Sequence, residues 1–400
     1  MQEENIFPAA ERIISDINSA FKKDPKLKEF DIVAVTLNEN KSPVVVENHC
    51  LGLESWCVKH VYCHAYSRVM EIRQQKRRKE DPERIENLLT VALLINPDVS
   101  SMWNMRRELV MTSHLDANGE LLFSSVVLSR KPKSGDVFAY RRWLINNVLM
   151  KDCPSNYSYL TDELHISMLA AERYSNNYHA WNHRKWCLGQ LLATLDTDSS
   201  ADLLSSEWSM SRTWIATHVS DYSGFQYRQQ VLSKILDICV KRYQKDSEKV
   251  LRLFFRPNEN GDAENNCDSI LDSLDATSKS VLAFLSSELF FNSELILLFP
   301  GHEAIWCHRR FVLYTFHKRF LSSSNNSLRR VYCREDGSPL EKELKTEAVA
   351  METSQAETLL RTLVSLERTL CLRCRDDSQQ SKAASRHRVW MERVLKIKFS

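Results

Sequence analysis

Residues Asn176–Trp186 read NNYHAWNHRKW, which places two Trp, two His, one Tyr, one Arg and one Lys in eleven positions. Such a density of aromatic and cationic side chains fits three roles: a binding site, a catalytic site or a packing device between helices. A packing device is expected to recur along the chain, so internal copies of the stretch are the first thing to look for.

The stretch has relatives that share an aromatic residue followed three positions later by Arg. Their arginines are separated by 35, 43, 44 and 81 residues, and the last gap is about two periods. A worn sixth copy is predicted at RHRVWMERVL, with Trp390 and Arg393 in the two positions. The five clear pairs are Trp103 with Arg106, Phe138 with Arg141, Trp181 with Arg184, Phe225 with Arg228, and Trp306 with Arg309.

The spacing within each copy is helical. The first polar residue, the aromatic residue and the Arg stand at i, i+4 and i+7, on one face of a helix. Asn177 and Asp221 occupy the first position and are predicted N-caps. The aromatic ring fills space between helices, and the Arg is expected to bond backbone carbonyls or a carboxylate of the adjacent repeat.

A period of roughly 35–44 residues accommodates two helices and two short connections. We therefore expect an all-α fold, a right-handed α-α superhelix that is a solenoid of helical hairpins. On this interpretation Trp181 and Arg184 are structural. Tyr178, His179 and His183 are not required by the packing pattern, so they remain candidates for a functional role.

The composition supports a helical protein. Only 8 of 400 residues are Gly, whereas tight turns and phosphate-binding loops consume glycine. The net charge of +2, with both signs interspersed, indicates neither a nucleic-acid nor a membrane surface. Apolar runs such as VALLI and LILLF are shorter than the roughly 18 residues of a membrane span, so no transmembrane segment is predicted. Eleven cysteines without a framework pattern favour free thiols and a cytoplasmic location.

Two regions are distinguished along the chain. Residues 1–80 are predicted to hold an N-terminal helix, a small β-hairpin within residues 31–46, where two β-branched runs flank a polar turn, and a first long helix. Residues 81–400 are predicted to hold the helical repeats. Polar inserts are expected near residues 256–279 and 322–346.

The block N-x-x-x-W-x-x-R, repeated at this spacing, resembles the repeat of the alpha subunits of heterodimeric protein prenyltransferases. The resemblance covers about residues 90–315 and extends to a second stretch at about residues 380–395. It implies a crescent of helical hairpins that wraps around a beta subunit, which would carry the zinc and the isoprenoid diphosphate pocket. It also implies a protein substrate with a prenylatable cysteine, and geranylgeranyl is favoured over farnesyl. No cofactor is expected on this chain alone.

The resemblance carries over to single residues in two neighbouring blocks. It implies that Lys133 and Tyr178 lie by the lipid diphosphate and assist catalysis, and that His179 lies at the subunit junction. Asp136 stands where farnesyltransferase-type subunits often have Gln, which helps to bind the substrate's C-terminal carboxylate. Because two carboxylates repel, we expect this chain not to read a free C-terminus in that way.

One alternative function stays open. In it, the chain is a non-catalytic helical-repeat scaffold for protein–protein interaction that kept the stacking motif, and Lys133 and Tyr178 are a solvated lysine and a packing aromatic.

A possible metal site is also considered. The helix-spaced Cys57, His60, Cys63 and His64 have the ligand types for zinc, but no second ligand cluster follows, so no metal site is predicted. The lone pair Cys371 and Cys374 is interpreted in the same way.

Overall fold

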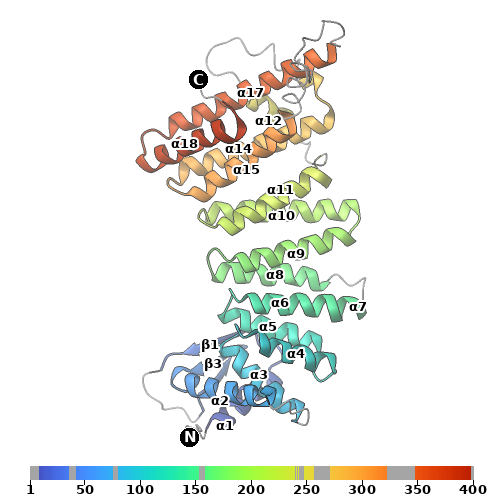
Figure 1. The fold of residues 1–400 in the computed structure, drawn as a ribbon, viewed down its shortest axis with the longest axis vertical. Helices are drawn as coiled ribbons and strands as arrows, with labels where there is room; N and C mark the ends of the chain where they lie inside the picture. The colour runs from blue at the N-terminus through green and yellow to red at the C-terminus, as the bar shows by residue number, and fades with distance from the viewer. Residues whose placement is uncertain are drawn as a thin grey trace, which may run out of the picture. The chain divides into compact units, whose positions relative to one another are not determined.

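The computed structural model describes residues 9–35, 42–74, 80–152, 158–238, 240, 242, 247–255, 271–321 and 347–397. Contacts divide the chain into two compact units, residues 1–194 and 195–400. Each unit is built mainly of helices, and the first also contains a small sheet (Figure 1). The predicted all-α class of repeated helical hairpins is confirmed. The predicted boundary near residue 80 stays a prediction.

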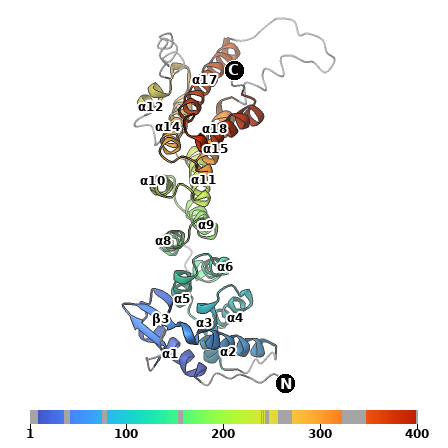
Figure 2. The ribbon, with the colours of Figure 1, turned by 90° about the vertical axis from the view of Figure 1, so that its left-hand side faces the viewer.

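The first unit begins with a helix and a three-stranded sheet, shown beside each other in Figure 2. Strand β3 is central, parallel to β1 and antiparallel to β2. The helices that follow pair as hairpins. The elements are α1 (Ala10–Lys23), β1 (Glu29–Val33), β2 (Val44–Glu47), β3 (Cys50–Glu54), α2 (Ser55–Gln74), α3 (Pro82–Ile95), α4 (Ser100–Met111), α5 (Ala117–Arg130), α6 (Gly135–Leu144), η1 (Ile145–Leu149), α7 (Met150–Asp152), α8 (Ser158–Arg173) and α9 (Tyr178–Thr194).

The expected hairpin exists, but the sequence interpretation paired the wrong strands. β2 pairs with β3, whereas β1 and β2 lie on opposite sides of β3. The tight turn is Asn48–His49, whose φ values of 51° and 65° fit the two-residue turns that join twisted antiparallel strands. The polar residues 36–41, which resembled a hairpin turn, lie outside the described residues.

The second unit consists of further helical pairs. The elements are α10 (Thr197–Thr217), α11 (Tyr222–Ile238), α12 (Ser247–Phe254), α14 (Ala276–Leu298), α15 (Glu303–Phe320), α17 (Glu347–Arg373), α18 (Ser378–Trp390) and η3 (Met391–Leu395). Most of the two predicted polar inserts, residues 256–270 and 322–346, lies outside the described residues. Residues 276–279 are not part of an irregular insert, because Asp275 caps α14, accepting a hydrogen bond from the Ser278 amide.

Helix α14 is the one helix in the described part of the chain that is long and apolar enough to cross a membrane. Its mean hydropathy is 1.6 over the best window, and 67% of that window is buried inside the protein. It packs against α12 and α15 and carries the buried Glu288, as a core helix does. Polar residues divide this apolar helix into short runs such as LILLF, so its full length was not recognised from the sequence.

Candidate functional site

Four of the repeated arginines, Arg106, Arg141, Arg228 and Arg309, are built into buried ion pairs with the following hairpin. Arg141 of α6 donates through Nε to Glu163 of α8 at 2.8 Å, and the other guanidinium arm also contacts this carboxylate. Its remaining nitrogen donates to the Leu121 carbonyl and, at 2.7 Å, to the Ser124 hydroxyl. A fork that satisfies both a carboxylate and backbone acceptors makes burial of the charge tolerable. This pair therefore ties one hairpin to the next.

The same carboxylate accepts a third hydrogen bond from the hairpin to which it belongs. His183 Nε2 lies 2.7 Å from Glu163, and both side chains are buried. His308 and Glu288 repeat this contact at 2.7 Å. Tyrosine takes the place of histidine in two hairpins, where Tyr140 donates to Glu120 and Tyr227 to Glu207, both at 2.5 Å. In every case the acid stands 20 residues before its donor.

The predicted repeat residues of the five clear copies are at most 5% exposed. They are Trp103, Arg106, Phe138, Arg141, Asn177, Trp181, Arg184, Phe225, Arg228, Trp306 and Arg309. The repeated glutamates were missed by sequence reasoning, although the fixed distance of 20 residues to the His or Tyr was a detectable signal. His183, one of the candidates for function, is part of this buried framework.

The sixth copy is present, but its alignment differs from the prediction. His387 of α18 contacts Glu367 of α17 at 2.9 Å, again over 20 residues, and Glu367 binds Arg309 at 2.8 Å. His387 therefore corresponds to His308, so the aromatic and arginine positions of this copy fall on Ser385 and Arg388, and the predicted Trp390 and Arg393 were wrong. The error arose because the aromatic position of this copy is occupied by a small residue, Ser385.

Lys133, Tyr178 and His179 meet at the start of helix α9. The Lys133 ammonium lies 5.6 Å from the Tyr178 ring centre and 4.6 Å from that of Tyr174, within cation–π range. The Tyr178 and His179 ring centres are 4.0 Å apart. Tyr178 is 49% exposed and Lys133 is exposed, so both polar heads are available to a ligand or partner.

Asn177 holds the two connections of this site together. Its Oδ1 accepts from the Ala180 amide at 3.2 Å and so caps α9, as predicted. Its Nδ2 donates to the Pro132 carbonyl at 2.7 Å, next to Lys133, and to the Ala170 carbonyl at 3.0 Å. The buried amide thus fixes the α5–α6 connection against the α8–α9 connection, which brings Lys133 beside Tyr178.

Carboxylates border the cationic residues on one side. Asp136 accepts from the Ser100 hydroxyl at 2.8 Å, and Asp98 accepts from Ser134 at 2.7 Å. The His179 ring covers Gly135, where a Cβ atom would lie 2.6 Å from His179 Cε1. Burial, followed by the positive charges of Lys133 and Arg142, lowers the pKa of His179. His179 is therefore neutral near pH 7 and leaves Lys133 as the cation of the site.

The arrangement is suited to holding an anion rather than to performing catalysis unaided. Lys133 supplies a positive charge, and the Tyr178 hydroxyl and the His179 ring supply hydrogen-bonding groups. We call Lys133, Asp136, Tyr178 and His179 the junction site. The structure brings all four sequence-predicted site residues to neighbouring positions on α6, α9 and the connections that precede them.

The candidate zinc ligands do not converge within the described residues. The Cys57 thiol is buried and donates to the Glu54 carbonyl at 3.1 Å, and burial raises the pKa of Cys57 to about 11. His64 instead pairs with Glu11 at 2.9 Å. In the part of the chain that the structure describes, no three His, Cys, Asp or Glu side chains are grouped to hold a metal ion.

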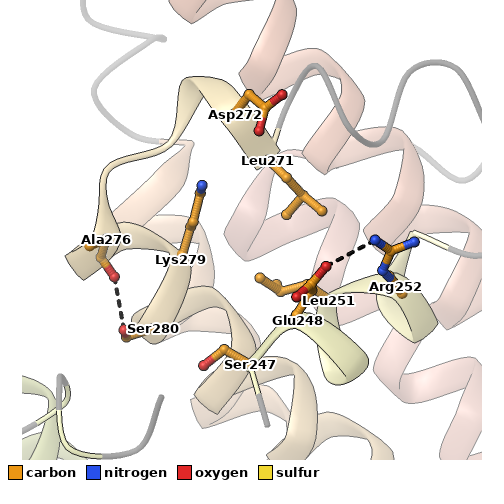
Figure 3. Close-up of a pocket in the computed structure, with 9 residues that line it drawn as sticks. All are labelled: Ser247, Glu248, Leu251, Arg252, Leu271, Asp272, Ala276, Lys279 and Ser280. Atoms are coloured by element: carbon orange, nitrogen blue, oxygen red, sulfur yellow. Dashed lines mark hydrogen bonds and ion pairs between the residues drawn. The ribbon is translucent and has the colours of Figure 1, made fainter. Parts of the chain in front are cut away.

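A cavity of about 560 Å³ lies between α12 and α14 of the second unit (Figure 3). Leu251 and Leu271 supply apolar walls, and Glu248 is paired with Arg252 at 2.9 Å. The Ser280 hydroxyl donates to the Ala276 carbonyl at 2.8 Å. None of the predicted site residues lines this cavity, and its hydrogen bonds are local to each helix, so the junction site remains the candidate.

Comparisons with known proteins identify the repeat. Residues 160–191, 204–235 and 285–316 match the family described as protein prenyltransferase alpha subunit repeat. Each match begins three residues before the buried Glu and covers both helices of one hairpin. Protein prenyltransferase alpha subunit repeat-containing protein 1 of Danio rerio is 32% identical over 335 residues, covering 79% of this chain and 74% of the relative. The chain belongs to the protein prenyltransferase alpha subunit repeat family.

Two further relatives outline this family. Protein prenyltransferase alpha subunit repeat-containing protein 1 of Homo sapiens is 30% identical over 330 residues, 78% of this chain and 79% of the relative. Geranylgeranyl transferase type-2 subunit alpha of Saccharomyces cerevisiae is 26% identical over 145 residues, 35% of this chain and 42% of the relative. The family predicted from NNYHAWNHRKW is thus confirmed.

Proposed function

We propose that this chain is the alpha-type subunit of a heterodimeric protein prenyltransferase and helps to transfer an isoprenoid from its diphosphate to a protein cysteine. The observation that carries the proposal is the meeting of Lys133, Tyr178 and His179 at one exposed edge. Two of these side chains are retained where packing does not demand them, because Tyr178 is half exposed and Lys133 is exposed.

The chemistry of the junction site fits a diphosphate leaving group. In prenyl transfer the bond from the lipid carbon to the bridging oxygen breaks, and negative charge grows on the diphosphate. A lysine ammonium and a tyrosine hydroxyl placed there stabilise that charge most in the transition state. The pyrrole-type proton of neutral His179 offers a further donor to the same edge or to a partner chain.

The remaining parts are assigned to a beta-type partner. The zinc ion and the lipid pocket are expected there, and the zinc would lower the pKa of the substrate thiol. Geranylgeranyl is the favoured lipid, since the similar Saccharomyces cerevisiae protein is named as a geranylgeranyl transferase subunit. A cytoplasmic location is proposed because the cysteines in the described part of the chain are free thiols.

The experiment is co-expression of the chain with candidate beta subunits, followed by size measurement and a lipid-transfer assay with both diphosphates. A stable one-to-one complex that transfers geranylgeranyl supports the proposal. A chain that forms no such complex, or a complex inactive with both lipids, would contradict it.

A scaffold is the second candidate, and one observation favours it. The relatives that cover most of this chain are named only as repeat-containing proteins. If the chain is a scaffold, substitutions of Lys133 and Tyr178 leave lipid transfer by any associated enzyme unchanged.

A further inference from the structure

The residue after the buried repeat arginine is also a cation in several copies. Arg107 follows Arg106 on α4, and Arg142 follows Arg141 on α6. Unlike their buried neighbours, both are only half-buried. Because α4 packs beside α6 and α6 beside α9, the two side chains stand on successive hairpins of the same face.

Arg107 is poorly satisfied within the described residues. Its guanidinium carbon lies 5.8 Å from the Tyr140 ring centre and 5.5 Å from that of Trp143. One arm donates to Asn104 Oδ1 at 2.5 Å, while the buried Nε has no acceptor. A guanidinium has five N–H donors, so most of its capacity is left for an external acceptor or water.

Arg142 repeats this situation one hairpin later. One arm lies 3.5 Å from His183 Nδ1, at the limit of a hydrogen bond. Burial lowers the pKa of Arg142, and no carboxylate in the described part of the chain pairs with it or with Arg107. Burying a cation without its counter-charge is costly, so a ligand that supplies the charge would bind favourably.

Two tryptophans flank these arginines. Trp143 stacks on Tyr140 with ring centres 6.0 Å apart, and Trp186 stacks on His183 at 5.5 Å. Both tryptophans are half-buried, which leaves part of each indole exposed. Arginine and tryptophan are the side chains most enriched at protein interfaces that bind tightly.

We propose that Arg107, Arg142, Trp143 and Trp186 form a docking surface for an extended acidic segment of a partner polypeptide. The inference goes beyond the proposed function, because it requires no lipid transfer. Each arginine would receive one carboxylate in a two-pronged contact, and the indoles would cover the apolar residues between the acids.

The spacing of the helices favours a polypeptide over a single small anion. Neighbouring packed helices lie about 8–10 Å apart, so we expect two arginines at equivalent places on α4 and α6 to be separated by about that distance. An extended chain advances about 3.3 Å per residue, and acids three positions apart span about 10 Å. Because a hydrogen-bonded guanidinium carbon lies about 4 Å from a phosphorus atom, one phosphate reaches both arginines only at the lower end of this range, whereas such a peptide contacts both across it.

The test uses the full-length chain and a fluorescein-labelled extended peptide with two Glu three positions apart, separated by β-branched residues. Matched peptides carry Gln at both positions, or two adjacent Glu. Binding is measured by fluorescence anisotropy for the wild type and for Arg107→Gln, Arg142→Gln and the double variant. Lys59→Gln removes an exposed cation from α2 and serves as the charge-matched control.

We expect the spaced-Glu peptide to bind at least about tenfold more tightly than the Gln peptide. Each single variant should weaken it several-fold and the double variant at least about tenfold, with Lys59→Gln unchanged. Equal weakening by Lys59→Gln, equal binding of adjacent and spaced Glu, or efficient competition by inorganic diphosphate would overturn the proposal. If a variant fails to fold by circular dichroism, the comparison of the three peptides on the wild type still decides it.

Discussion

Glu163 stands 20 residues before His183 and accepts a hydrogen bond from its Nε2 at 2.7 Å, inside the core of the first unit. The same carboxylate binds Arg141, which belongs to the preceding hairpin. One acid therefore connects the two helices of its own hairpin and joins that hairpin to its neighbour. The same contact between an acid and a histidine recurs at Glu288 and Glu367 in the second unit, so it underlies the repeat in both units of the chain.

Glu163→Gln should be strongly destabilising. The change leaves the buried Arg141 without its counter-charge, and breaking a buried ion pair in this way costs about 3–5 kcal/mol. The matched control is Glu357→Gln, which removes a partner of the exposed pair between Glu357 and Arg361. That change should cost less than about 1 kcal/mol. Urea unfolding followed by circular dichroism measures both, and similar midpoints for the two variants would show that the buried pair is not structural.

His183→Tyr should preserve the fold and reduce its sensitivity to acid. Tyr140 and Tyr227 already make the equivalent contact, so a neutral donor is sufficient. Burial lowers the pKa of His183 below its ordinary value of 6.5, so the unfolded chain binds a proton more readily. The contribution of His183 is therefore complete above about pH 6.5 and is lost as the pH falls below it.

Glu163 adds a second, more acidic window. Its pKa is lowered to about 2, because Arg141 and His183 outweigh the effect of burial. Its contribution is complete above its ordinary value of 4.5 and is lost as the pH falls towards 2. Between pH 7.5 and 5.5 only the His183 window applies, so the urea midpoint should fall less in His183→Tyr than in the wild type. Parallel pH profiles for the wild type and the Tyr variant would refute this account. His183→Phe, which lacks the donor, should lower the free energy of unfolding by about 1–3 kcal/mol at pH 7.5.

Gly135→Ala should disturb the junction site without unfolding the chain. The new Cβ would lie 2.6 Å from His179 Cε1, so the imidazole must move. Gly119→Ala is the control, because its Cβ would be 3.7 Å from the Asp116 carboxylate and the helix would gain about 0.5–1 kcal/mol. The imidazole signal of His179 in NMR spectra reports the movement. An unshifted His179 signal in Gly135→Ala would show that the packing is looser than described.

Asp136→Gln tests how the substrate is read. The Asp136 carboxylate, which accepts from Ser100, would repel a substrate carboxylate within about 4 Å by roughly 1–4 kcal/mol. In the complex with a beta-type subunit, the variant should therefore gain activity towards peptides with a free C-terminal carboxylate relative to their amides. Asp162→Asn, which removes an exposed carboxylate from α8, is the control. Unchanged selectivity in Asp136→Gln would remove Asp136 from the specificity of the site.

The repeat itself was visible in the sequence because the Trp or Phe and the Arg keep one spacing on one helix. The acid that binds the Arg was missed, since Glu163 comes from another helix and its one regular signal is the distance of 20 residues to His183. The strand pairing failed for a related reason. Val44–Glu47 fits either neighbour by composition, and only the Asn48–His49 turn, with both φ values positive, selects β3.

The residues of the junction site could be predicted from the sequence, but their arrangement in space could not. Lys133 and Tyr178 are 45 positions apart in the sequence, yet Asn177 connects their loops through the Pro132 carbonyl. Sequence spacing cannot reveal a side chain that bonds across two connections. It also could not distinguish His179, which covers Gly135, from His183, which is buried against Glu163.

The most direct measurement is single-turnover lipid transfer by the complex of this chain with its beta-type subunit, comparing wild type with Lys133→Ala and Tyr178→Phe. The account predicts intact complexes and a rate of transfer reduced about 10- to 1,000-fold for Lys133→Ala, with a smaller loss for Tyr178→Phe. Lys59→Gln should transfer at the wild-type rate. Wild-type rates in both junction-site variants would contradict a catalytic role and leave this chain as a scaffold.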